Sequence, residues 1–109
     1  MFTVKKRMEI AGAHRLFLPY ESKCSQLHGH NWIITVICQS EKLNAEGMVV
    51  DFQRIKEIVG RLDHSVINDV LGGVNPTVEH IAFWICRQIP QCVRVEVQES
   101  EGNVAVYEP

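Results

Sequence analysis

Two segments in the first half of the chain have patterns of polar and apolar residues that are typical of strands. The alternation is approximate over residues 3–14, and residues 28–40 are rich in Ile, Val, Thr and Trp. Side chains of a strand point to its two faces in turn, and β-branched and aromatic residues are enriched in strands. The pattern therefore predicts β-strands over residues 3–14 and 28–40.

Two later segments have apolar residues at a helical period. Asp51 is a good N-cap for a first helix, and Gly60 indicates its end. A second helix is predicted from about Thr77 to Pro90, because proline cannot continue a helix. Residues 61–77 contain several Gly, Asn and Asp residues, so they are predicted to form a loop with room for only short structure inside it. The predicted apolar faces comprise Phe52, Ile55, Ile58, Val59 and Leu62 in the first helix and Val78, Ile81, Ala82, Ile85 and Ile89 in the second.

The C-terminal segment is typical of a β-hairpin. Apolar and polar residues alternate over residues 92–100, a turn follows at residues 101–103, and residues 104–107 return as the partner strand. The element order is therefore ββααββ. It predicts a single α+β domain over residues 1–109, in which two helices cover one face of a four-stranded antiparallel sheet.

Length and composition exclude several classes of protein. The chain has 109 residues, 46% hydrophobic and 22% charged, which fits one globular core better than disorder or a fibrous repeat. A net charge of -2 provides no global positive field, so nucleic acid is not an expected partner. The longest nearly continuous apolar run, residues 32–38, is far shorter than the roughly 20 residues of a membrane helix. No membrane partner is expected.

The remaining composition signals favour a cytoplasmic location. Charges occupy the N-terminal segment MFTVKKRMEI where a secretory signal would carry its apolar stretch. The four cysteines form no CxxC pair and no dense framework, which suits a reducing compartment better than a disulfide scaffold.

Three histidines provide the strongest signal for chemistry. His28 and His30 flank Gly29, so in an extended strand both side chains lie on one face. His14 ends the preceding predicted strand, which can pair with this one. An isolated HxH is commonly a pair of surface histidines, but a third imidazole on the facing strand favours a metal site. Three neutral imidazoles suit Zn²⁺ and leave a fourth position open.

Cys24 lies in a polar loop close to these histidines, between Lys23 and Ser25. It could be a fourth zinc ligand that closes a structural site, a thiolate beside an open site, or a buried structural cysteine. The polar surroundings argue against the last of these. The other cysteines lie on apolar elements and are predicted to be in the core; they are Cys38, Cys86 and Cys92.

Further candidates lie in the second half of the chain. Asp63 and His64 could transfer protons near neutral pH, or they could be a loop-capping aspartate and an exposed histidine. His80 falls on the polar face of the second helix and is predicted to be solvated. By alternation Glu99 shares the face of the strand's valines, where a carboxylate needs a partner or a ligand; a strand end that reaches water is the alternative. A nitrogen-rich heterocycle with adjacent N–H donors would pair with it.

Six motifs occur in order along the chain: Ala13–His14, CxxxHGH at 24–30, VDF at 50–52, LDHxxxND at 62–69, NPTxE at 75–79 and VQES at 97–100. In these motifs the chain resembles the 6-carboxytetrahydropterin synthases of the 6-pyruvoyl-tetrahydropterin synthase family. The similarity covers nearly the whole chain in order, and the three residues between Cys24 and the HGH sequence favour the carboxy branch. Ile10, Ala11, Gly12 and Ser100 depart from the family's usual residues and bear on pocket shape.

This resemblance implies a role for each candidate. Zn²⁺ would be held by three histidines, Cys24 would be the general base, and Glu99 would anchor the pterin ring with Thr77 in the ring pocket. Asp63 and His64 would complete the proton-transfer set. The implied fold is the tunnelling fold, in which sheets join into a barrel in a homo-oligomer, trimer-based and expected to be a hexamer, with active sites between subunits. The implied zinc ligands are His14, His28 and His30.

The implied reaction converts 7,8-dihydroneopterin triphosphate to 6-carboxy-5,6,7,8-tetrahydropterin, acetaldehyde and triphosphate, a step toward queuosine and related deazapurines. The residues alone support only metal-assisted proton transfer on a heterocycle. Two alternatives remain at this point. One is a 6-pyruvoyl-tetrahydropterin synthase, which eliminates triphosphate and keeps the side chain. The other is a non-catalytic oligomer stabilised by zinc.

Overall fold

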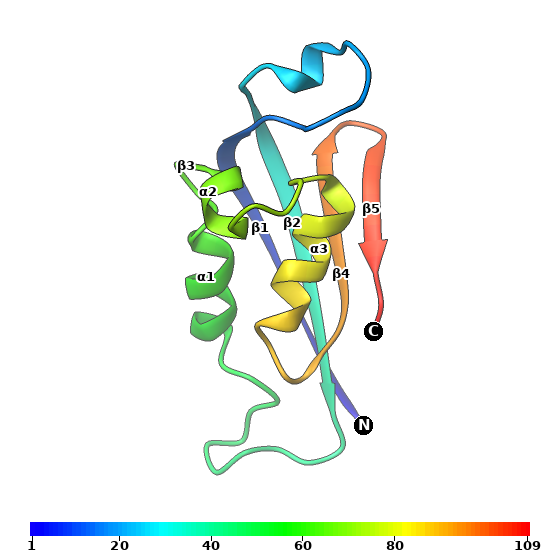
Figure 1. The fold of residues 1–109 in the computed structure, drawn as a ribbon. Helices are drawn as coiled ribbons and strands as arrows, with labels where there is room; N and C mark the ends of the chain where they lie inside the picture. The colour runs from blue at the N-terminus through cyan, green and yellow to red at the C-terminus, as the bar shows by residue number, and fades with distance from the viewer.

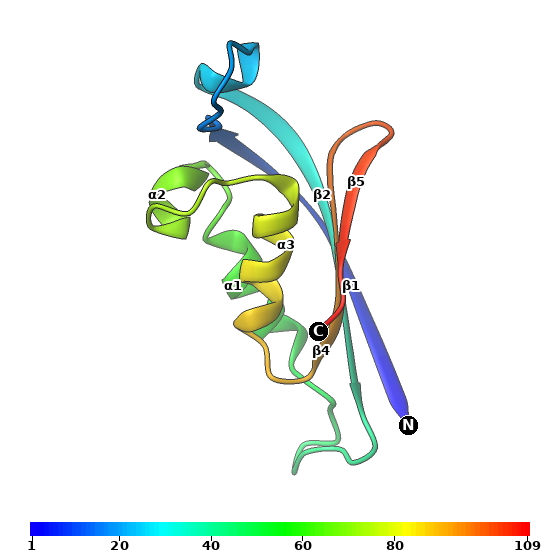
Figure 2. The same cartoon turned by 45° about the vertical axis from the view of Figure 1, so that its right-hand side comes forward.

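A computed structural model describes residues 1–109 of the protein. The chain folds into one β-sheet with its helices on one face (Figures 1 and 2). The sheet has five strands in the order β3-β1-β2-β4-β5, antiparallel except for the parallel β1–β3 pair. The strands are β1 (Phe2–His14), β2 (His28–Ser40), β3 (Ser65–Val66), β4 (Cys92–Ser100) and β5 (Asn103–Tyr107). The helices are α1 (Phe52–Gly60), α2 (Ile67–Leu71) and α3 (Val78–Arg87), and a 3₁₀ turn, η1, spans Lys23–Ser25.

The α+β class, the long strands and both predicted helices are confirmed. The predicted count of four strands and two helices was wrong, because the connection over residues 61–77, where only short structure was expected, contains β3 and α2 and gives the sheet a fifth strand and the fold a third helix. Ile67 and Leu71 drive this local structure, since both are buried in the core. The helix is short because Gly72 ends it in the left-handed conformation, with φ of 65°.

The core lies between the helices and the sheet face that they cover. Along β2 every second side chain is buried there, and both long helices begin at side-chain caps. Asp51 accepts a hydrogen bond from the Gln53 N–H at 2.8 Å, and Thr77 accepts one from the His80 N–H at 3.2 Å. The buried side chains of β2 are Trp32, Ile34, Val36 and Cys38.

Positions on the predicted apolar faces that are not fully buried include Phe52 and Val93. Phe52, at the start of α1, is 48% exposed, and its ring lies beside the ammonium group of Lys6 on β1, 5.9 Å from ring centroid to Nζ, rather than in the core. Val93 is only half-buried, whereas its neighbour Cys92 is buried. The pairing of β2 with β4 shifts register between Ile37 and Cys38, and such an irregularity changes which side chains face the core.

Gly12 lets the loop after α1 approach β1 closely. A Cβ atom at this position would lie 3.0 Å from the carbonyl oxygen of Leu62 and 3.0 Å from Cδ1 of Ile67. Any larger residue would push this loop away from the strand. On the same strand, the Gly12 carbonyl accepts a hydrogen bond from the indole of Trp32 at 3.0 Å. Glycine therefore allows β3 and α2 to pack beside the end of β1 that carries His14.

The opposite face of the sheet carries no helix (Figure 2). No helix of the chain is both long enough and apolar enough to cross a membrane.

Candidate metal centre

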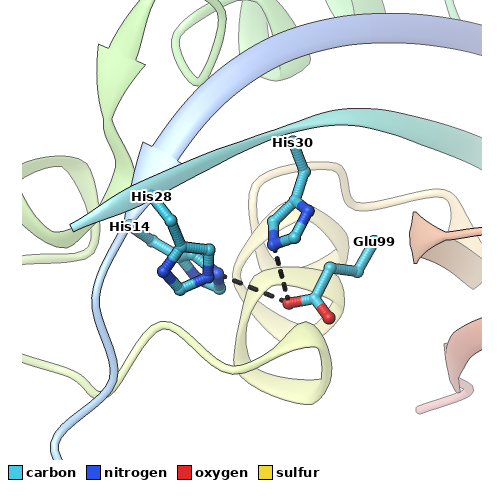
Figure 3. Close-up of side chains that lie close together, drawn as sticks. All are labelled: His14, His28, His30 and Glu99. Atoms are coloured by element: carbon cyan, nitrogen blue, oxygen red, sulfur yellow. Dashed lines mark ion pairs between the residues drawn. The ribbon is translucent and has the colours of Figure 1, made fainter. Parts of the chain in front are cut away.

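Three imidazoles and one carboxylate converge at one end of the sheet (Figure 3). One ligand atom from each of the four side chains can be chosen so that all four lie within 4.8 Å of one another. The pairing of β1 with β2 explains the histidines, because His14 lies opposite His28 and Gly12 lies opposite His30. The predicted convergence of His14, His28 and His30 is confirmed, and Glu99 from the end of β4 is the fourth member.

Backbone carbonyls fix the orientation of two of the rings. Nδ1 of His14 lies 2.8 Å from the Pro76 carbonyl oxygen, and Nδ1 of His28 lies 2.7 Å from the Gln26 carbonyl oxygen. A carbonyl only accepts, so each Nδ1 carries the proton and each Nε2 presents a lone pair. This is the arrangement that holds metal-binding histidines in their ligating tautomer.

Two imidazole nitrogens at the centre of the cluster are buried without a hydrogen-bond partner in the protein. They are Nε2 of His14 and Nε2 of His30. Oε1 of Glu99 lies 3.4 Å from the first and 3.6 Å from the second. Lone pairs and a carboxylate oxygen repel one another in a buried site unless a cation or protons lie between them. The donor set therefore fits a divalent metal, and imidazole nitrogens with a carboxylate oxygen are ligands that Zn²⁺ accepts.

Burial lowers the pKa of His14 from its usual value of 6.5. The hydrogen bond to Pro76 acts in the opposite direction, and the neighbouring His28 lowers the pKa further. Its side chain is fully buried, so water cannot solvate the imidazolium. His14 is therefore neutral near pH 7, which is the form that binds metal.

The same shift predicts that metal-free protein loses stability in mild acid. The unfolded chain takes up a proton on His14 near pH 6.5, whereas the folded protein takes it up only at a lower pH. Stability is thus fully present above pH 6.5 and falls as the pH decreases toward the folded pKa. Urea unfolding of the metal-free protein between pH 7.5 and 5.5 measures this slope. A His14→Gln variant, which cannot titrate there, should show a flatter slope, and equal slopes would contradict the assignment.

Cys24 is exposed and does not belong to the cluster. It lies in η1, where its N–H donates to the Ser22 hydroxyl at 3.1 Å and its carbonyl accepts from the Leu16 N–H at 2.8 Å. The fourth donor beside the three imidazoles comes from Glu99 rather than from this thiol. The arrangement thus gives no support to a zinc site closed by Cys24, and it leaves the thiol free for chemistry.

Asp63 and His64 pair with each other and with β1. Oδ1 of Asp63 accepts from the Ala11 N–H at 2.9 Å and lies 3.8 Å from Nε2 of His64. The His64 N–H donates to the Ala11 carbonyl at 2.7 Å, and its side chain is 84% exposed. Its φ of 53° is left-handed, a conformation that histidine adopts more readily than most residues. The aspartate thus has an anchoring function, and the imidazole remains accessible.

His64 and the metal cluster border a common open hollow on the surface. No hydrogen bond or ion pair joins His64 to the cluster, but both His64 and His30 line this hollow, together with parts of β1 and β2. A substrate bound there could contact both.

The other predicted residues have simple structural positions. Thr77 caps α3, and His80 is exposed, as predicted, with Nδ1 bonded to the Asn75 carbonyl oxygen at 2.7 Å. The predicted core cysteines are buried. Burial, followed by the hydrogen bond to Cys92, raises the pKa of Cys86 to about 12, so this thiol stays protonated. The three buried cysteines are Cys38, Cys86 and Cys92.

Sequence reasoning missed two features of the centre. It did not place Glu99 beside the imidazoles, although the charge on the buried face of β4 was the available signal. It also gave no sign of the Pro76 carbonyl, because a backbone partner leaves no trace in residue identity.

Comparisons with known proteins agree with this geometry. The family model of 6-pyruvoyl tetrahydropterin synthase matches residues 3–109. A Bacillus subtilis protein named 6-carboxy-5,6,7,8-tetrahydropterin synthase is 32% identical, with 99% of this chain and 86% of the relative covered. A Synechocystis protein of the same name is 35% identical, with 98% and 93% covered.

A solved structure supports the fold independently. The 6-pyruvoyl tetrahydropterin synthase of Caenorhabditis elegans superposes with a TM-score of 0.77 at 21% identity, covering 99% of this chain and 95% of that one. The chain belongs to the 6-pyruvoyl tetrahydropterin synthase family, and it is an enzyme of that family with the tunnelling fold.

Proposed function

We propose that this member of the 6-pyruvoyl tetrahydropterin synthase family is a zinc-dependent lyase that forms 6-carboxy-5,6,7,8-tetrahydropterin. Its substrate would be 7,8-dihydroneopterin triphosphate, and its other products would be acetaldehyde and triphosphate. The observation that carries the proposal is the convergence of three imidazoles on one centre beside Glu99. The names of the relatives that match nearly the whole chain support the carboxy product.

The three histidines would hold the metal through Nε2 of His14 and the facing nitrogens of His28 and His30. Zn²⁺, when bound, would supply Lewis-acid chemistry, which acidifies hydroxyl groups and polarises a carbonyl. The buried position of His14 keeps the ring neutral, and its bond to Pro76 keeps the ring correctly oriented.

The remaining residues would bind the substrate and move protons. Glu99 would accept two N–H groups of the pterin ring, with Thr77 at the edge of the ring pocket. The thiolate of Cys24 would remove a carbon-bound proton, for which its exposed position is suitable. His64, held beside Asp63, would pass protons to or from solvent.

We further propose a cytoplasmic homo-oligomer, trimer-based and hexameric, that acts in queuosine biosynthesis. Two observations support assembly. One face of the sheet has no helix, and β5 leaves a strand edge without a partner in this chain (Figure 2). An oligomer could also bring Cys24 or His64 of one copy to the metal centre of another.

Product analysis tests the reaction. With the purified zinc-loaded protein we expect one acetaldehyde for each triphosphate released, because side-chain cleavage accompanies elimination in the carboxy reaction. Triphosphate without acetaldehyde would instead indicate the 6-pyruvoyl product. No consumption of the substrate would contradict both.

A Cys24→Ala variant tests whether this thiol is the catalytic base. If Cys24 is the base, the variant keeps its zinc and its fold while triphosphate release falls by about 100-fold or more, since a positioned acid or base contributes about 10²- to 10⁴-fold. Loss of zinc from this variant would favour the non-catalytic oligomer with a structural site.

A further inference from the structure

Two asparagine side chains hold the backbone that follows the metal ligand His14. Oδ1 of Asn68 accepts from the Arg15 N–H at 2.9 Å, and Nδ2 of Asn68 donates to the Arg15 carbonyl at 2.9 Å. Asn75 repeats this arrangement on Phe17, with distances of 2.9 Å and 3.1 Å. Each carboxamide therefore satisfies both polar groups of one backbone residue.

The spacing of the two bonded residues explains the geometry. In extended backbone the N–H and C=O groups of alternate residues point to the same edge, so residues 15 and 17 present theirs to one side. β3, which pairs with β1 on this side, ends at Val66. Asn68 and Asn75 thus replace a neighbouring strand beyond the point where β3 stops.

The opposite edge of the same segment contacts the loop of Cys24. The N–H of Leu16, between Arg15 and Phe17, donates to the Cys24 carbonyl at 2.8 Å. The residue after Asn75 is Pro76, whose carbonyl orients His14. Residues 15–17 are thus hydrogen-bonded to the two asparagines on one side and to the backbone of Cys24 on the other.

We propose that Asn68 and Asn75 are positioning residues that fix the loop of Cys24 relative to the metal centre. The inference rests on the proposed function for its catalytic consequence, because it concerns the residue that acts there as the base. It assigns a role to two motif asparagines, in LDHxxxND and NPTxE, that the candidate reaction does not use directly.

Asn68 and Asn75 form a clamp on the backbone of Arg15 and Phe17, and the hydrogen bonds of this clamp require a side-chain amide. Aspartate has the same shape and keeps the acceptor for the backbone N–H, but its second oxygen would face the carbonyl oxygen of Arg15 or Phe17. The exchange of an N–H donor for an oxygen replaces one hydrogen bond by a repulsion. Asn68→Asp and Asn75→Asp therefore open the clamp with little change in volume.

Asn44 offers a matched control. Its Oδ1 accepts from the N–H groups of Glu46 and Met48 at 3.0 Å and 2.9 Å, and its Nδ2 makes no protein hydrogen bond. It lies in the exposed loop between β2 and α1, at the other end of the sheet (Figure 1). Asn44→Asp keeps both of its bonds, so the same chemical change should have no effect there.

The experiment compares the zinc-loaded double variant N68D/N75D with wild type and N44D. Hydrogen exchange of residues 15–26 is expected to be at least about ten-fold faster in the double variant, because local opening sets exchange rates. We expect kcat to fall by about ten-fold or more while zinc content stays at the wild-type level and KM changes little, since misplacement of a catalytic group by about 1 Å can cost up to 100-fold. N44D should match wild type in all four measurements.

The outcomes separate this inference from the proposed function. Unchanged exchange of residues 15–26 in the double variant overturns the clamp, whatever the activity. Faster exchange with unchanged kcat overturns the positioning role. If wild type converts no substrate, the proposed function fails, and exchange alone then decides whether the asparagines hold the Cys24 loop. The single variants N68D and N75D, each of which opens half of the clamp, give the same readouts if the double variant does not fold.

Discussion

Replacement of His28 or His30 by alanine is expected to abolish stoichiometric zinc binding and, with it, enzymatic activity. Each variant removes one of three imidazoles from a centre whose fourth donor is a carboxylate. Loss of a residue that only supports a ligand costs about 10- to 100-fold in metal affinity, so loss of a ligand itself should exceed about 100-fold. Metal analysis of the purified variant after dialysis against a weak chelator measures the effect.

His64→Ala is the control for this result. His64 is 84% exposed, and no hydrogen bond or ion pair joins it to the cluster, so the variant should keep one zinc per chain. Its activity should nevertheless fall if His64 moves protons. Stoichiometric zinc in His28→Ala or His30→Ala would show that the ion binds elsewhere.

The histidine cluster was predictable because strand geometry places alternate residues on one face. His28 and His30 follow this rule directly, and the antiparallel pairing with β1 brings in His14. Nothing beyond the period of the strand and the order of the elements was needed. Local sequence rules also placed Cys38 in the core and Asp51 at the N-cap of α1 correctly.

Features that depend on short elements or on backbone groups were not predictable. β3 and α2 have two and five residues, too few for a hydrophobic period to be recognised, and their turn-forming neighbours indicated a loop. The clamp of Asn68 and Asn75 leaves no pattern either, because asparagine in a turn-rich segment is expected for local reasons. Only the tertiary arrangement brings these side chains to the backbone of Arg15 and Phe17, just after β1.

Glu99→Gln is expected to weaken substrate binding much more than it weakens the fold or zinc binding. The carboxylate lies on the face of Val95 and Val97, is 23% exposed, and could accept two parallel N–H bonds from a pterin ring. Glutamine offers one acceptor and places an N–H group opposite a donor of the ring. The loss of a hydrogen bond to a charged group costs about 1.5 to 3 kcal/mol, which is roughly a 10- to 150-fold increase in Kd.

The position of Glu99 makes zinc content the deciding measurement. Because its Oε1 lies 3.4 Å from Nε2 of His14 and 3.6 Å from Nε2 of His30, the carboxylate could serve the metal as well as the ring. Three imidazoles suffice to hold zinc, so we expect Glu99→Gln to retain it while substrate affinity falls. Glu101→Gln, in the exposed turn after β4, should change neither quantity. Parallel loss of zinc and substrate in Glu99→Gln would instead make Glu99 a metal ligand, and unchanged affinity would mean that the ring is held by other residues.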